Sequence, residues 1–86
     1  MGLKKLAQKV ADYQQRLEAG KASTIEPRHV EKVLDKLRRK EAELLARIAS
    51  ETERDERVDL DRKLRVAREH MTRAEWLLAE VSSRPR

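Results

Sequence analysis

The sequence predicts an all-α protein, built as a long antiparallel helical hairpin that resembles a coiled coil, with an N-terminal third helix completing a three-helix bundle. Charged residues make up 43% of the 86 residues and aromatic residues 2%, with two Gly and two Pro. This is the composition of long helices. Apolar residues recur at alternating steps of three and four, as in a helical seam. The register of this pattern shifts once, so we expect a turn within a single helical domain, 1–86.

The first helix is predicted over about 3–19. Its apolar positions form a narrow stripe, with Gly20 just beyond its end, where a left-handed residue commonly closes a helix. The stripe residues are Leu3, Leu6, Val10, Tyr13 and Leu17.

The second helix is predicted over about 26–51. Ser23 followed by Glu26 fits a capping box, and Pro27 is tolerated in a first helical turn because its missing N–H would be unpaired there. The seam of this helix has an apolar flank on each side and one acidic residue in its middle. Its members are Val30, Leu34, Leu37, Glu41, Leu44 and Ile48, flanked by Val33 and Leu45.

The stretch Ser50 to Arg57 has no apolar residue, and the seam that resumes after it is out of heptad register with Ile48. A single continuous helix would turn its apolar stripe to another side. We therefore expect a turn near Thr52 to Glu56 and a third helix over about 57–82. The seam of that helix is Leu60, Leu64, Ala67, Met71, Ala74, Leu78 and Val81.

Folding the chain at this turn pairs two helices of about 36 Å each and predicts burial of Leu37, Leu44, Leu64 and Met71. The first helix fits antiparallel to the second, with Leu17 near Val30. Two alternatives remain open at this stage. The first helix stays loose until a partner binds, or two hairpins associate as a four-helix bundle.

Glu41 interrupts the seam of the second helix. A buried carboxylate is costly unless it is paired, and Arg68 is predicted to lie across the hairpin from it. The contact would then set the register of the two helices. The alternative is that the stem of Glu41 packs while its carboxylate reaches water.

No enzyme signature is convincing. The chain has no cysteine, which excludes thiolate nucleophiles and cysteine metal sites. Glu26 and His29 have the spacing used in di-iron bundles, but no second copy of that motif exists. We expect no catalytic or metal-binding residue, no cofactor and no small-molecule substrate.

Basic residues raise nucleic-acid binding as an alternative function, because the net charge is +5 and such clusters attract phosphate. Acidic residues surround the cluster on the second helix, and no base-stacking aromatic platform accompanies it, so we favour a solvated, ion-paired surface. Binding of the first helix to an anionic membrane surface is a weaker alternative. The candidate nucleic-acid-binding residues are Lys4, Lys5, Lys9, Lys36, Arg38, Arg39 and Lys40.

Trp76 marks a candidate partner site. On a helical wheel it points away from Leu78, so the hairpin seam cannot bury it. Arg73 lies beside it, with Leu77 and Val66 as an apolar flank, and Trp and Arg commonly anchor interfaces. The competing interpretation is that the first helix or the tail from Ser82 to Arg86 covers the ring.

These features predict a non-enzymatic protein–protein interaction module, acting as an adaptor, small subunit or regulator. It would present helical faces to a partner protein or to its own copy. No apolar run in the sequence reaches the ~20 residues needed to span a bilayer, and the N-terminal residues lack a signal-peptide pattern. We therefore expect a cytoplasmic protein without a transmembrane segment.

Overall fold

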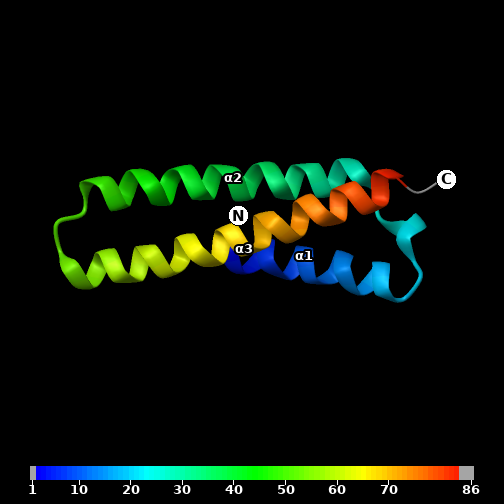
Figure 1. The fold of residues 1–86 in the computed structure, drawn as a ribbon, viewed down its shortest axis with the longest axis horizontal. Coiled ribbons are helices and arrows are strands. Elements are labelled where there is room, and N and C mark those ends of the chain that lie inside the picture. Colours follow the sequence, from blue (N-terminus) through cyan, green and yellow to red (C-terminus); the bar gives the residue numbers. More distant parts are fainter. Residues whose placement is uncertain (1, 84–86) are drawn as a thin grey trace.

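The computed structural model describes residues 2–83, which form three α-helices and one short 3-10 turn (Figure 1). The helices are α1 (Leu3–Glu18), α2 (Pro27–Ser50) and α3 (Arg54–Ser83), and the 3-10 turn η1 (Ala22–Thr24) joins α1 to α2. The bundle is elongated, with principal extents of 50 × 18 × 18 Å. The predicted three-helix bundle is confirmed, because α2 and α3 form the long hairpin and α1 packs on both.

Gly20 closes α1 as predicted. It adopts φ +75°, its N–H donates to the Leu17 carbonyl at 3.2 Å, and the N–H of Lys21 donates to the Arg16 carbonyl at 2.8 Å. These two bonds satisfy carbonyls that the end of the helix leaves free, in the arrangement of a Schellman motif. The chain can therefore leave α1 sharply and return toward α2.

The capping box predicted for Ser23 and Glu26 is wrong. Ser23 lies in η1, and Glu26 is the N-cap residue of α2 without a side-chain capping hydrogen bond. The linker is held by other contacts, since the Thr24 hydroxyl donates to the Lys21 carbonyl at 2.7 Å and Ile25 is buried in the core. Pro27 occupies the first turn of α2, as predicted.

The turn between α2 and α3 is shorter and earlier than predicted. It comprises residues 51–53, and the N–H of Glu53 donates to Oε1 of Glu51 at 3.0 Å. The helix α3 then begins at Arg54, ahead of the predicted start at 57, with Asp55 and Glu56 in its first turn. Acidic side chains at that position interact favourably with the helix dipole. The helix therefore begins well before its first buried apolar residue.

The core consists of two clusters along the hairpin. The larger lies where all three helices meet, and the smaller contains Leu44, Leu60, Leu64 and Ala67, with Leu3 and Ile48 packed against it. Burial of Leu37, Leu44 and Leu64 is confirmed, whereas Met71 is only partly buried. The larger cluster comprises Leu6, Val10, Tyr13, Leu17, Ile25, Val30, Val33, Leu34, Leu37, Ala74, Leu77 and Val81.

Docking of α1 makes the two flanks of α2 unequal. Val33 is buried in the cluster that contains the apolar stripe of α1, while Leu45 remains 42% exposed. Burial of the predicted apolar flank of α2 is therefore confirmed at Val33 and wrong at Leu45. The helix α1 begins at the junction of the two clusters, because Leu3 packs against both, and it runs toward the end of the bundle opposite the α2–α3 turn (Figure 1). The remaining half of the hairpin has two helices only.

Candidate interaction surface on the outer face of the third helix

Trp76 projects from the outer face of α3. Its side chain is 51% exposed, while its neighbour Leu77 is fully buried. The prediction that the hairpin seam does not bury Trp76 is confirmed. Neither α1 nor the described part of the tail encloses the ring, and residues 84–86 of that tail lie outside the described residues. A half-exposed indole removes a large apolar area from water when a partner covers it.

The predicted neighbours of Trp76 divide between surface and core. Arg73 is exposed and Val66 is half-buried, so both lie at the surface of α3. Leu77 is 0% exposed and belongs to the larger core cluster, so its assignment to a partner-binding flank is wrong. Docking of α1 widens the buried arc of α3, which takes in Leu77 completely and leaves Leu78 only partly buried. A seam derived from the α2–α3 hairpin alone does not take account of α1.

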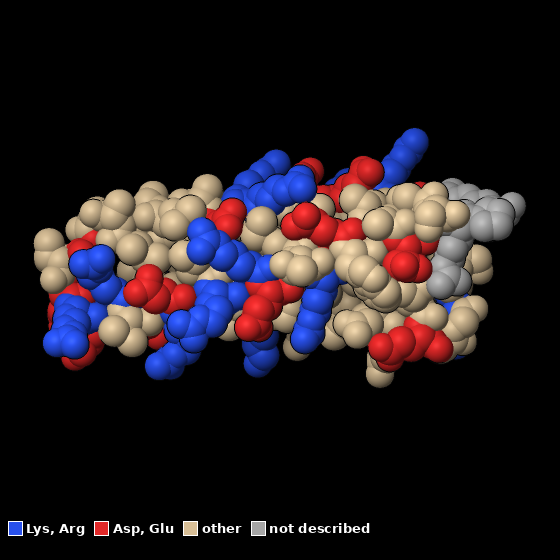
Figure 2. Space-filling view, viewed as in Figure 1, with Lys and Arg blue, Asp and Glu red and all other residues tan. Residues whose placement is uncertain are grey.

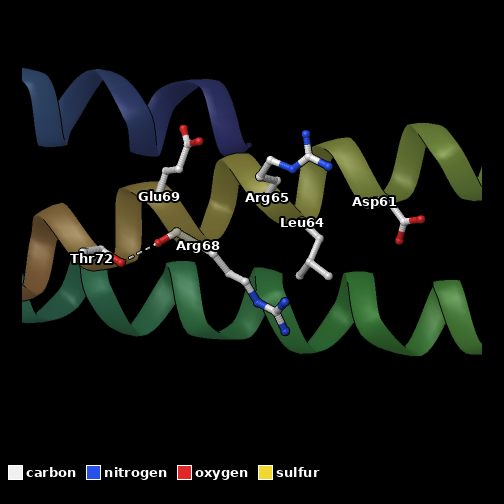
Figure 3. Close-up of a pocket in the computed structure, with 6 residues that line it drawn as sticks. All are labelled: Asp61, Leu64, Arg65, Arg68, Glu69 and Thr72. Carbon is white, nitrogen blue, oxygen red and sulfur yellow. Dashed lines mark hydrogen bonds between the residues drawn. The ribbon is translucent and has the colours of Figure 1, made fainter.

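An open groove continues this surface along α3 (Figure 3). Leu64, 8% exposed, supplies its apolar part, and the Thr72 hydroxyl donates to the carbonyl of Arg68 at 3.1 Å. Arg65 and Glu69 point away from α2 in Figure 3, whereas Arg68 points toward it. The lining residues are Asp61, Leu64, Arg65, Arg68, Glu69 and Thr72. They carry both signs of charge, which suits contact with a surface that has the complementary pattern of charges.

Arg68 links this groove to α2. Its Nε donates to Oε2 of Glu41 at 2.8 Å, with the side chains 54% and 25% exposed respectively. The predicted meeting of Glu41 and Arg68 is confirmed. The carboxylate that interrupts the α2 seam therefore lies at the rim of the hairpin and has a charged partner.

His70 is half-buried on α3, and its Nδ1 has no hydrogen-bond partner among the described residues. Burial lowers the pKa of His70 below 6.5, the positive charge of Arg73 lowers it further, and Glu69 opposes both effects. Desolvation disfavours the charged imidazolium. The pKa of His70 therefore depends both on burial in the bundle and on the exposed charges of Arg73 and Glu69.

Tyr13 of α1 has the opposite shift. Burial raises the pKa of its phenol above 10.0, partly offset by Arg16. The Arg16 guanidinium carbon lies 5.7 Å from the centroid of the Tyr13 ring and Arg16 also pairs with Asp12 at 2.7 Å. Both contacts lie within α1 and stabilise the helix itself, whereas its buried residues Val10, Tyr13 and Leu17 pack it against the bundle.

The candidate nucleic-acid-binding residues lie on two neighbouring helices. Lys4, Lys5 and Lys9 are exposed on the N-terminal half of α1, which lies beside the middle of α2. Four more, Lys36, Arg38, Arg39 and Lys40, lie close together on α2, where Lys36 and Lys40 are half-buried.

Acidic side chains accompany the basic residues of α2. Arg38 lies 3.6 Å from Asp35, and Lys40 lies 3.7 Å from Glu43. On the face shown in Figure 2, basic and acidic side chains are interleaved. Interleaved charges weaken the phosphate attraction that a basic stripe would provide.

A second exposed apolar surface lies on α2 near the interhelical turn. Leu45 is its largest member, flanked by the exposed Ala42, Ala46 and Ala49. In Figure 2, the end of the bundle that carries the turn has a continuous area without charged side chains over α2. Leu45 lies on α2, whereas Val58 and Trp76, also exposed, both belong to α3.

No three His, Cys, Asp or Glu side chains within residues 2–83 are placed to hold a metal ion together. None of the described helices is both long and apolar enough to cross a membrane. Comparison of the chain with protein-family models, with curated proteins and with solved structures gives no match. Its class is therefore defined by the fold alone, as an all-α three-helix bundle.

Proposed function

We propose that this chain is a non-enzymatic protein–protein interaction module that presents the outer face of α3 to another protein chain. The observation that carries the proposal is the half-exposed indole of Trp76, 51% accessible on a helix whose inward residues are already packed. Trp and Arg are enriched among the residues that dominate interface energies, and Arg73 is exposed beside Trp76. Val66 adds apolar area on the same helix.

The rigidity of the scaffold supports this role. Buried apolar side chains line the contact between α2 and α3 along its whole length, from Val30 and Val81 at one end to Leu60 near the turn. The backbone of such helices is fixed before a partner arrives, so less conformational entropy is lost on binding. The protein would thus act as an adaptor, small subunit or regulator by presenting a preformed surface.

Charge pairing favours a protein partner over nucleic acid. Arg38 and Lys40 each have an acidic neighbour within 4 Å on their own helix, which reduces the cationic surface open to phosphates. Binding to nucleic acid falls steeply as salt concentration rises because counterions are released. Contact through Trp76 should depend on salt only weakly.

The test is affinity capture with the wild-type chain and with Trp76→Ala, after circular dichroism shows that both are folded. We expect a protein retained by the wild type at low and moderate salt and lost with Trp76→Ala. Leu45→Ala is the matched control, because it removes an exposed apolar side chain from α2 instead. Equal capture by Trp76→Ala, or capture of nucleic acid alone, would overturn the proposal.

Tryptophan emission provides a second readout, since Trp76 is the chain's single tryptophan. In the dilute protein, emission should be red-shifted and readily quenched, and it should shift to the blue as the captured partner is added. A blue-shifted, quencher-resistant signal at all dilutions would mean that the ring is internal.

A further inference from the structure

The outer face of α3 carries a second heptad stripe, opposite its core seam. Every side chain on this stripe is exposed, and successive members alternate in steps of four and three residues. This spacing keeps residues on one line of a helix that faces a neighbouring helix. The stripe, here called the outer stripe, comprises Val58, Arg62, Arg65, Glu69, Thr72, Trp76 and Ala79.

The outer stripe is self-complementary when two copies run antiparallel. Placing a twofold axis at the level of Ala67 sets Val58 of one copy against Trp76 of the other. In the same register Arg62 meets Thr72 and Arg65 meets Glu69. Each contact occurs twice, because a twofold interface pairs residue i with j and j with i.

We propose that the partner fitted by the outer face is a second copy of this chain, docked antiparallel through the outer stripe of α3. This inference rests on the proposed function and specifies its partner.

The apolar residues of α3 support a second copy as the occupant. Val58 and Trp76 are 52% and 51% exposed. They lie about 27 Å apart along the helix, at about 1.5 Å per residue, so they cannot cover each other within one chain. In the antiparallel dimer each Trp76 ring covers a Val58 side chain, at both ends of the contact.

The charges of the outer stripe select the same arrangement. Among the described residues no ion pair engages Arg65 or Glu69, and the dimer brings each to an opposite charge. A parallel dimer would instead set Arg65 against Arg65 and Glu69 against Glu69, since every residue would face its own counterpart. Like-charge contacts across an interface are strongly unfavourable, so the antiparallel orientation is preferred.

One flank of the outer stripe favours the dimer. This flank contains Asp59, Val66 and Arg73. In the antiparallel dimer, Val66 of one copy meets Val66 of the other beside the axis, which brings two half-buried apolar side chains together. Arg73 approaches Asp59, which pairs with Lys63 at 3.3 Å in the single chain. This flank therefore adds apolar contact and opposite charges.

The other flank opposes the dimer. Asp61 approaches Glu75 of the second copy, a like-charge pair that weakens the contact. Arg68 comes near its own counterpart, although its guanidinium is directed toward α2 by the bond to Glu41. Replacing Glu75 by a cation should therefore tighten self-association, which gives the proposal a gain-of-function test.

The experiment is sedimentation equilibrium of the full chain at concentrations up to about 1 mM, the range in which weak interfaces associate. We expect a monomer–dimer equilibrium, weakened about tenfold or more by Arg65→Glu or by Glu69→Arg, because each creates a like-charge pair across the axis. Glu75→Lys should strengthen it. All three positions are exposed, and circular dichroism confirms that each variant is folded.

Mixing the two weakened variants is the decisive step. Arg65→Glu paired with Glu69→Arg restores opposite charges at both contacts across the axis, while each chain keeps two like charges four residues apart on its own helix. Recovery of dimer in the mixture therefore reports pairing between chains and not repair of a single helix. A mixture that stays monomeric, or a wild-type dimer indifferent to Arg65→Glu, would overturn the proposal.

Failure of this inference can be told apart from failure of the proposed function. A wild-type chain that is monomeric at about 1 mM overturns self-association. If a different captured protein then shifts Trp76 emission to the blue, the outer face is still an interaction surface. If no protein does so, both proposals fail.

Discussion

Arg68 on α3 donates from Nε to Oε2 of Glu41 on α2 over 2.8 Å, and this ion pair joins residues 27 positions apart in the chain. Glu41 lies between Leu37 of the larger core cluster and Leu44 of the smaller one. The polar contact therefore marks the junction of the two clusters. It is made at the rim of the hairpin, where Glu41 remains 25% exposed.

A double-mutant cycle on this pair, with Glu41→Gln, Arg68→Gln and both changes together, should give a coupling energy of about 0.2–1 kcal/mol, typical of partly exposed pairs. Urea unfolding at low salt measures it, and high salt should reduce it because the pair is accessible to ions. Arg39→Gln, an exposed arginine on α2, is the control. A coupling of zero would mean that Glu41 contributes only through the packing of its stem.

Leu44 and Leu45 are adjacent in sequence and should respond differently to truncation. Leu44 is 1% exposed within the smaller cluster, whereas Leu45 is 42% exposed. Leu44→Ala should lower the free energy of unfolding by about 2–5 kcal/mol because it leaves a cavity. Leu45→Ala should cost less than about 1 kcal/mol, because little of its area is buried. Similar losses in thermal or urea unfolding would contradict this placement of the core.

The heptad pattern is enough to predict the hairpin, because steps of three and four identify Leu37, Leu44 and Leu64 as inward residues. It also predicts the outward direction of Trp76, which depends only on helical geometry. The pattern misplaces residues whose burial depends on α1. Leu77 is buried and Leu45 exposed because α1 packs on one flank of the hairpin only, and a wheel drawn for two helices treats the flanks as equal.

The ends of the helices follow local chemistry that the apolar pattern does not contain. Acidic residues at Asp55 and Glu56 allow α3 to start at Arg54, before any apolar side chain is available to be packed. Ile25 is buried in a linker where no periodic pattern exists. Gly20 was predictable, because a glycine directly after an apolar stripe has a specific conformational use.

Replacing Gly20 tests the end of α1. Gly20 has φ +75°, and no atom lies within 4 Å of the place that a Cβ would occupy, so the cost of a side chain there is conformational and not a clash with neighbours. Gly20→Ala should lower the free energy of unfolding by about 1–2 kcal/mol. Gly20→Asn should cost less, since Asn visits the left-handed region more readily. Equal losses for the two variants in urea unfolding would argue against this explanation.

Hydrogen exchange should rank α1 below the hairpin in local stability. The helix α1 has 16 residues against 24 and 30 in α2 and α3, and it can detach while the hairpin core around Leu44 remains packed. Regions with fewer buried contacts open at lower free energy. Amides near Val10 should therefore exchange faster than those near Leu44 under native conditions. Equal protection would mean that α1 and the hairpin unfold as one cooperative unit.

The stability of the bundle should depend on pH through His70. Burial, reinforced by Arg73, lowers the pKa of His70 in the folded chain below the value of 6.5 that it has in the unfolded chain. At a pH between the folded and the unfolded pKa, the unfolded chain therefore binds more protons than the folded chain. The free energy of unfolding therefore falls as pH drops through 6.5 and levels off below the folded pKa, while stability is fully present at higher pH. His70→Gln should flatten this dependence in urea unfolding measured across that range. His29→Gln, at an exposed position on α2, controls for the loss of a histidine as such. If His70→Gln follows the same pH profile as the wild type, the buried Nδ1 does not control the acid sensitivity of the fold.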